Sequence, residues 1–216
     1  MLATLASFIA DKTIGRPLRV AVDGRTASGK TTFSNEIAAL VERAGGPVIR
    51  TSIDGFHRPK AERYARGRHS PEGYYYDSRD LLAVRRLLLD PLGPDGDRRY
   101  RTASFDLAND CPLDQPAQTA PTDAVLIVDG TFLQRPELVD GWDFVIFVLA
   151  SQQRCEQRGI QRDAGALGGI EAASQLYATR YRPAFDLYEK LCAPAATADV
   201  VFNNDDLEWP SMIVRN

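Results

Sequence analysis

Residues 18–36, LRVAVDGRTASGKTTFSNE, decide the fold of this chain. The apolar run from Leu18 to Val22 predicts a buried strand, and apolar residues spaced three or four apart from Phe33 onward predict a helix. Between them, residues 24–31 read GRTASGKT and match the pattern G-x-x-x-x-G-K-[ST]. Strand, glycine-rich loop and helix in this order predict a P-loop, a backbone cradle for phosphate groups.

The residue types of the loop predict its chemistry. Gly24 and Gly29 let backbone N–H groups turn inward, and the N-terminus of the following helix adds positive partial charge. Lys30 supplies a point charge to the phosphates, and Thr31 offers a hydroxyl that can ligate Mg²⁺. We therefore predict a nucleotide site whose metal ligand is Thr31. Its residues are Gly24, Arg25, Thr26, Ala27, Ser28, Gly29, Lys30, Thr31 and Thr32.

Composition narrows the class of protein. The 216 residues suit one α/β domain, so residues 1–216 are predicted to form a single domain. The formal charge of −3 argues against a nucleic-acid partner bound by neutralising many phosphates. The scattered cysteines form no zinc or disulfide pattern, which favours a cytoplasmic location. Asp11 and Lys12 end an N-terminal apolar stretch of about ten residues, too short to span a membrane.

Two acidic residues come at the ends of predicted strands. Asp54 ends the run that begins at Val48, and Asp129-Gly130 follows the apolar residues 124–128. In open α/β sheets the carboxyl ends of the strands form the ligand-binding edge. We therefore predict that Asp54 faces the terminal phosphate and that Asp129, in a Walker B position, holds Mg²⁺ or its water. The alternatives are a turn cap for Asp54 and an ordinary buried strand end for Asp129.

Two stretches without a clear period interrupt the strands and helices. Residues 57–76, HRPKAERYARGRHSPEGYYY, combine basic and aromatic side chains, and residues 98–121 hold a β-like segment and a proline-rich connector. Long excursions of this kind are usually functional or mobile. Both are predicted to lie on the substrate side, although a solvated position is an equal alternative for any single arginine of the first. Between them, Asp77-Ser78 predicts the N-cap of a helix.

Arg154, Arg158 and Arg162 are four residues apart and so share one face of a predicted helix. Like charges on one face favour contact with phosphate, and a solvated charged face is the alternative. Residues 154–170, which end in several glycines, are predicted to form a lid. Further apolar runs near 144–149 and 199–203 complete about five strands. They predict an α/β fold: a P-loop NTPase-type doubly wound parallel sheet with helices on both faces.

Several motifs together resemble the uridine kinase family of P-loop phosphotransferases, relatives of phosphoribulokinase and pantothenate kinase. The likeness covers most of the chain and implies ATP as phosphoryl donor, Mg²⁺ as cofactor and a homo-oligomer. Besides the P-loop, the matching motifs are D-x-F-x-R at 54–58, Tyr76-Asp77, Phe105-Asp106, Val128-Asp129-Gly130 and RYRPAFDLYEKLCAPAATADVVF at 180–202.

The resemblance implies transfer of the γ-phosphoryl group of ATP to the 5′-hydroxyl of a pyrimidine nucleoside, uridine or cytidine. Asp54 would accept or orient the proton of that hydroxyl. Lys30 would act on the phosphates together with the lid residues Arg158 and Arg162, and the lid would exclude water. Asp77 would hold ribose hydroxyls. The implied substrate-binding residues are Asp54, His57, Arg58, Tyr76, Asp77, Phe105 and Asp106.

Two segments depart from the family pattern and keep the acceptor open. The chain has Ala108-Asn109-Asp110-Cys111 where the family has Ser-His-Ser-Arg, and AGALGGIE follows Arg162-Asp163 in place of E-R-G-R-D. Arg180, Arg182 or the arginines of 58–68 are candidates to replace the missing lid arginines. The acceptor alternatives are a nucleoside, a sugar or a pantothenate-like molecule, with ATP or GTP as donor. A nucleotide-binding switch that phosphorylates no metabolite is the alternative of another class.

Overall fold

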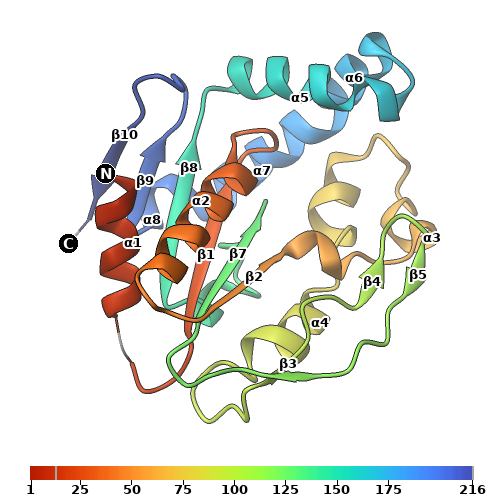
Figure 1. Cartoon of the computed structure of the whole chain (residues 1–216). Coiled ribbons are helices and arrows are strands. Elements are labelled where there is room, and N and C mark those ends of the chain that lie inside the picture. Colours follow the sequence, from red (N-terminus) through yellow and green to blue (C-terminus); the bar gives the residue numbers. More distant parts are fainter. Residues whose placement is uncertain (13, 216) are drawn as a thin grey trace.

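The computed structural model describes residues 1–12 and 14–215, in which helices cover a central sheet (Figure 1). The helices are α1 (Leu2–Asp11), α2 (Lys30–Arg43), α3 (Lys60–Arg63), α4 (Leu81–Val84), α5 (Gln152–Leu167), α6 (Ile170–Leu176), α7 (Arg182–Cys192) and α8 (Pro194–Thr197). The strands are β1 (Leu18–Gly24), β2 (Val48–Ser52), β3 (Arg99–Tyr100), β4 (Phe105–Asp106), β5 (Cys111–Pro112), β6 (Gln118–Thr119), β7 (Val125–Gly130), β8 (Phe144–Leu149), β9 (Val200–Asn203) and β10 (Ser211–Val214).

The central sheet has the strand order β10-β9-β8-β1-β7-β2. Strands β2, β7, β1, β8 and β9 are parallel, and β10 runs antiparallel to β9. Every residue of β1 is buried, as its apolar sequence predicts. The predicted P-loop-type parallel sheet is therefore confirmed. The edge strand β10 of this sheet was not predicted, because its four residues carry too little pattern to identify a strand.

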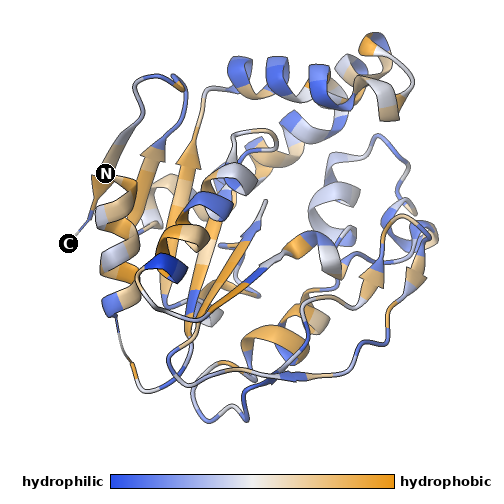
Figure 2. Ribbon diagram, viewed as in Figure 1, coloured by the Kyte–Doolittle hydropathy of each residue, from blue (hydrophilic) through white to orange (hydrophobic). Residues whose placement is uncertain are grey.

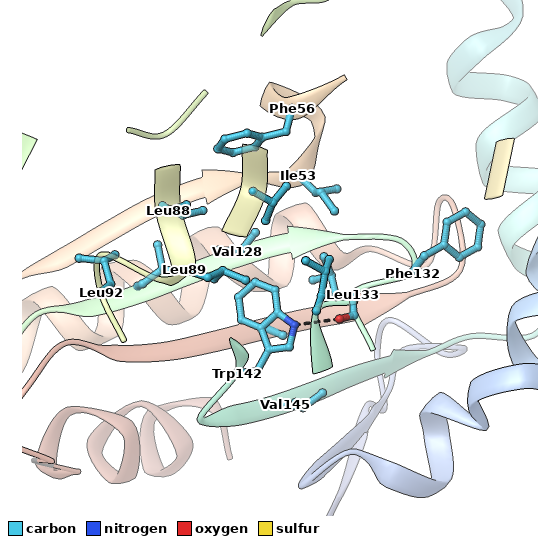
Figure 3. Packing of buried hydrophobic residues seen from close by; sticks show 14 of the residues in the cluster. Ile53, Phe56, Leu88, Leu89, Leu92, Val128, Phe132, Leu133, Trp142 and Val145 are labelled. Carbon is cyan, nitrogen blue, oxygen red and sulfur yellow. Dashed lines mark hydrogen bonds between the residues drawn. The ribbon is translucent and has the colours of Figure 1, made fainter. Parts of the chain in front are cut away.

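Alternate residues of the central strands point to opposite faces of the sheet and build two cores. On β7, Val125 and Ile127 join the cluster formed with α1 and α2, whereas Val128 joins the cluster formed with α4 and α7. Figure 2 shows the apolar strands between these layers. In the second cluster Trp142 donates its Nε1–H to the carbonyl of Leu133 at 2.8 Å (Figure 3), which satisfies the polar atom of a buried ring. Helices thus cover both faces, as predicted.

A 3₁₀ turn at Ile53–Phe56 leads from the end of β2 into the first excursion. The excursion then contains α3 and most of a π-helical turn at Gly73–Asp77. It ends at α4, whose N-cap is Asp80, with Oδ1 accepting from the backbone N–H of Ala83 at 2.9 Å. The cap predicted at Asp77-Ser78 is wrong. Arg66 Nε instead donates to the Asp77 carboxylate at 2.7 Å, so this side chain is held by an ion pair rather than by a helix end.

The second excursion contains two small antiparallel pairs, β3 with β6 and β4 with β5. The segment predicted as the lid comprises most of α5 and the glycines after it. Gly168 and Gly169 have φ values of 92° and 114°, which end the helix. A second π-helical turn, Tyr177–Tyr181, joins α6 to α7. Within residues 1–12 and 14–215, no helix combines the length and the apolar character needed to cross a membrane.

Candidate active site

The P-loop connects the end of β1 to the start of α2, near the centre of the sheet (Figure 1). Two of its positions require glycine. Gly24 has φ 152°, and a Cβ there would lie 2.5 Å from the carbonyl oxygen of Val148. Gly29, with φ 98°, is the N-cap of α2, and a Cβ there would lie 2.3 Å from Asn204 Nδ2. Only glycine therefore allows the loop to turn so tightly at the helix N-terminus.

The interior of the loop holds polar groups that suit an anion. Lys30 is 8% exposed, and its Nζ donates to the carbonyl of Arg25 at 2.8 Å. Burial lowers the pKa of this ammonium, although Asp23 and Asp129 nearby oppose the shift. Ser28 Oγ is buried and has no hydrogen-bond partner among the described residues, whereas the Arg25 guanidinium lies over the Phe185 ring and pairs with Glu189 of α7. A buried ammonium and a free hydroxyl beside a helix N-terminus fit the phosphates of a nucleotide.

A hydroxyl from α2 and a carboxylate from β7 meet beside the loop. Thr31 Oγ1 donates to Asp129 Oδ2 at 2.7 Å, which joins the first turn of α2 to β7. The other oxygen of Asp129 accepts from Arg50 Nη2 at 2.5 Å. In the described part of the chain, no cluster of three or more His, Cys, Asp or Glu could hold a metal. A single hydroxyl with a nearby carboxylate fits Mg²⁺, which takes most of its ligands from phosphates and water.

A buried carboxylate at the end of β1 holds the first residue of the loop. Asp23 is fully buried, and it accepts from Gly24 N at 2.7 Å, from Gln134 Nε2 at 3.0 Å and from the Tyr188 hydroxyl. Burial raises the pKa of Asp23, and these hydrogen bonds oppose the shift without cancelling it. Because Tyr188 belongs to α7, this network ties the start of the P-loop to a helix far along the chain. No local sequence pattern predicts this network.

A cavity of about 450 Å³ lies on one side of the loop. We call it the Phe33 cavity. Arg158 donates from Nη1 to the carbonyl of Asn204 and from Nη2 to that of Asp205, both at 3.0 Å. Asn204 in turn donates to the carbonyl of Ser28 at 2.8 Å, so this wall is tied to the P-loop. The lining residues are Leu2, Gly29, Thr32, Phe33, Glu36, Arg158, Phe202, Asn204, Leu207 and Pro210.

A second cavity, of about 250 Å³, lies on the other side of the loop. We call it the Asp54 cavity. It is formed by the P-loop, the first excursion, the end of α5 and the turn before α7. The lining residues are Thr26, Asp54, His57, Arg63, Tyr64, Tyr74, Ser78, Arg79, Leu107, Arg162, Asp163, Arg180 and Tyr181.

Asp54 is held in this cavity by a neighbouring arginine. Arg79 Nη2 donates to Asp54 Oδ1 at 2.7 Å. Partial desolvation at the edge of the cavity opposes ionisation of Asp54, whose side chain is 61% exposed, but the charge and the hydrogen bond of Arg79 overcome it and hold the pKa below its ordinary value. Ser52 Oγ, not Asp54, caps the turn that follows β2. The Asp54 carboxylate is therefore ionised at neutral pH and directed at Arg79.

The ring of His57 contacts the backbone of Asp54. Its Nδ1 is 2.8 Å from the carbonyl oxygen of Asp54, a contact in which Nδ1–H donates to the carbonyl. Burial and the charge of Arg79 lower the pKa of His57 to about 4. The ring is therefore neutral at physiological pH, and it fixes the backbone that carries Asp54.

The residues predicted from the sequence are distributed unevenly around the loop. Asp54, His57 and Arg162 line the Asp54 cavity, with Arg162 Nε donating to Asp163 at 2.7 Å, while Arg158 lines the Phe33 cavity. The other predicted substrate contacts do not line either cavity. Arg58 donates to the carbonyl of Arg79, Tyr76 is 43% exposed, Asp77 pairs with Arg66, Phe105 is buried, and Asp106 accepts from Asn109.

Several residues of the Asp54 cavity were not among the predicted contacts, above all Arg79 and Tyr64. Arg79 follows the Tyr76-Asp77 pair, where no motif points to it. Arg180, which begins the motif RYRPAF, was predicted only as one candidate to replace a missing lid arginine. Its place in a π-helical turn, a feature frequent at functional sites, is visible only in the structure.

Comparison with known proteins identifies the fold. No protein-family model and no curated protein sequence matches the chain. Among solved structures, a possible uridine kinase from Bacillus stearothermophilus is similar with a TM-score of 0.73 and 23% identity, covering 93% of this chain and 96% of that one. A "putative fructose transport system kinase" from a Silicibacter species has a TM-score of 0.72 and 25% identity, covering 88% and 94%. D-glycerate 3-kinase from Cryptococcus neoformans has a TM-score of 0.66 and 13% identity, covering 99% of both chains. The fold is that of the uridine kinase-like P-loop kinases, as the sequence resemblance implied.

Proposed function

We propose that this chain, with the fold of the uridine kinase-like P-loop kinases, is an ATP- and Mg²⁺-dependent kinase of a small alcohol. One observation carries the proposal: the P-loop lies between two cavities, with Gly29 and Thr32 lining one and Thr26 lining the other. A nucleotide bound with its phosphates on the loop would place its base in the Phe33 cavity. Its terminal phosphate would then face the Asp54 cavity, where the acceptor would bind.

The residues of the chain have distinct roles in this reaction. The backbone of the loop and Lys30 hold the phosphates and offset their charge. Asp54 accepts a hydrogen bond from the acceptor hydroxyl and takes its proton as the oxygen bonds to the γ-phosphorus. The bond between this phosphorus and the β–γ bridging oxygen breaks, and ADP leaves. Arg79 keeps Asp54 ionised and oriented before the acceptor arrives.

Thr31 and Asp129 are the residues that would hold Mg²⁺. Bound there, the ion supplies positive charge to the phosphate oxygens. Arg50 fixes one carboxylate oxygen of Asp129. The orientation of this carboxylate is therefore set by the protein before the nucleotide binds, which limits the cost of ordering it.

The identity of the acceptor is the finer part of the proposal. The resemblance favours the 5′-hydroxyl of uridine or cytidine, and the similar structures include proteins named for uridine, fructose and D-glycerate. All are alcohols, so the same donor site and the same carboxylate would serve each of them. A panel of these acceptors is the direct test of the proposal.

The experiment measures ADP release from ATP and Mg²⁺ with and without each acceptor. We expect at least one nucleoside, sugar or hydroxy acid to accelerate ADP release, with stoichiometric formation of its phosphate ester by mass spectrometry. Slow ATP hydrolysis that no acceptor changes would instead support the nucleotide-binding switch. Replacing ATP by GTP in the same assay identifies the donor.

A further inference from the structure

The Asp54 cavity has more positive than negative side chains. His57 is neutral, and the remaining charged residues of the lining are four arginines and two carboxylates. They are Arg63, Arg79, Arg162 and Arg180 against Asp54 and Asp163. Arg63, Arg79 and Arg162 each have a carboxylate partner, so one cation of the lining, Arg180, is left for the carboxylate or phosphate of an anionic acceptor to balance.

The arginines differ in whether the protein already satisfies them. Arg63 Nη1 donates to the carbonyl of Arg58 at 2.8 Å and to Asp110 at 2.7 Å, and Arg162 pairs with Asp163. Arg180 differs from both. It is 5% exposed, and no carboxylate among the described residues forms an ion pair with it. Its Nη2 is 3.5 Å from Ser78 Oγ, and its Nε has no partner there.

The surroundings of Arg180 hold its guanidinium in place. The Cζ atom lies 4.8 Å from the ring centroid of Tyr74 and 5.0 Å from that of Tyr64, so two aromatic faces stabilise the cation. The Tyr64 hydroxyl is a hydrogen-bond partner of the guanidinium, but the Nε donor has no partner among the described residues. Burial of a guanidinium with an unpaired donor is costly, and such a group is typical of a site that binds an oxyanion.

Three ionisable groups in the cavity respond to the same positive field. Burial and Arg79 lower the pKa of His57 to about 4. Burial opposes ionisation of Tyr64, yet Arg180 and Arg63 bring the pKa of its hydroxyl below the ordinary value. The pKa of Asp54 is lowered in the same sense. Each shift favours the more negative form of the group, as expected where an anion would be stabilised.

The contacts of Arg180 place it on the acceptor side rather than on the nucleotide. Tyr64, Tyr74 and Ser78 all belong to the first excursion and its end, and none belongs to the P-loop. Lys30, by contrast, is the basic side chain inside the loop, where its Nζ donates to the carbonyl of Arg25. The cavity therefore has a carboxylate that suits a hydroxyl, Asp54, and a separate cation, Arg180, that suits a second group on the same molecule.

From this geometry we propose that the acceptor is an anionic alcohol, such as a hydroxy acid or a sugar phosphate, whose carboxylate or phosphate is bound by Arg180 while its hydroxyl faces Asp54. The inference rests on the proposed kinase function and names the class of its acceptor. Arg79, whose Nε is buried without a partner, is the second arginine able to donate to this oxyanion.

The first test compares matched neutral and anionic acceptors with the unmodified protein. The pairs are glycerol with D-glycerate, D-fructose with fructose 1-phosphate, and D-ribose with ribose 5-phosphate, with uridine as a further neutral acceptor. We expect kcat/KM for an anionic member to exceed that of its neutral partner by about 10- to 100-fold, the usual effect of a hydrogen bond to a charged group. The glycerate and sugar phosphate arms distinguish a carboxylate from a phosphate.

The second test removes the guanidinium. Arg180→Gln should reduce kcat/KM for the anionic acceptor by about 10- to 100-fold and leave the KM for ATP within about 3-fold. Arg180→Lys keeps the charge but not the planar fork, so its loss should be smaller. Arg86→Gln removes an exposed arginine outside the cavity and is the control for net charge. Melting temperatures identify any variant that fails to fold, and the first test does not depend on them.

The outcomes separate this inference from the proposed function. If no acceptor of either charge is phosphorylated, the kinase proposal itself fails. If the kcat/KM of a neutral acceptor equals that of its anionic partner, the proposed kinase function stands, but the proposal of an anionic acceptor is overturned. An Arg180→Gln variant that raises the KM for ATP and slows every acceptor equally would also overturn it, because Arg180 would then serve the nucleotide.

Discussion

The P-loop and the Asp54 cavity are neighbours in space, but the chain builds them differently. Residues 24–32 are contiguous, and their hydrogen-bonding groups come mainly from the backbone. The cavity combines Thr26, Asp54, residues of the first excursion, Arg162 and Arg180, and it works mainly through side chains. A backbone site suits a ligand shared by many proteins, such as a nucleotide, whereas a side-chain site can be changed by substitution to suit a new acceptor.

A substitution that removes a phosphate-binding group of the loop should therefore slow phosphoryl transfer to every acceptor. Lys30→Ala removes the buried charge next to the phosphates, so kcat should fall by about 10³-fold or more with every acceptor. Steady-state ADP release measures this. Lys190→Ala, at an exposed position of α7, is the matched control and should keep normal turnover. Near-normal turnover of the Lys30 variant would contradict the assignment of the loop.

Substitution of Asp54 should slow phosphoryl transfer without weakening nucleotide binding. Asp54→Asn keeps the shape but cannot take the proton, so kcat should fall by about 10²- to 10⁴-fold. The KM for ATP should stay within about 3-fold, since the carboxylate lies outside the loop. Asp114→Asn, at a side chain that is 95% exposed, controls for the loss of a charge. If Asp54→Asn changes only the melting temperature, Asp54 is a structural residue.

The positive field of the cavity should be visible in the pH dependence of stability. The pKa of His57 is about 4 in the folded protein and about 6.5 in the unfolded chain, so the unfolded chain binds more protons between these values. The free energy of unfolding should therefore fall by up to about 3 kcal/mol as the pH drops from 6.5 to 4.

Urea unfolding at a series of pH values measures this slope. A His57→Gln variant should show a smaller slope than the unmodified protein, whereas His69→Gln, at an exposed position, should keep it. Equal slopes for all three proteins would show that His57 is not held neutral by Arg79.

Substitution of Arg158 or Arg162, the arginines of the predicted lid, should have the smallest effects of this series. Arg158 lines the Phe33 cavity, so Arg158→Ala should raise the KM for ATP by about 10-fold with little change in kcat. Arg162 lines the Asp54 cavity, so Arg162→Ala should lower kcat by about 10-fold with little change in the KM for ATP. Initial rates over a matrix of ATP and acceptor concentrations resolve both. Identical profiles would show that the arginines act as one group.

The strongest predictions from the sequence concerned local patterns. The apolar runs of β1, β7 and β8 predicted the parallel sheet, which the structure confirms, and the spacing of the P-loop glycines predicted the candidate phosphate site. Patterns that depend on distant partners failed. Asp77 has the composition of a helix cap, but Arg66 binds its carboxylate and Asp80 caps the helix instead. Side-chain competition of this kind leaves no trace in the local sequence.

The sequence by itself determined the nucleotide side of the site, because strand, loop and helix are adjacent in the chain and glycine geometry is a local property. The tertiary structure decided the acceptor side. It joins Tyr64 and Tyr74 of one excursion to Arg180 of a distant π-helical turn and leaves that guanidinium buried without a carboxylate. Burial and pairing depend on which segments meet in space, and the positive charge of the Asp54 cavity is therefore a property of the fold.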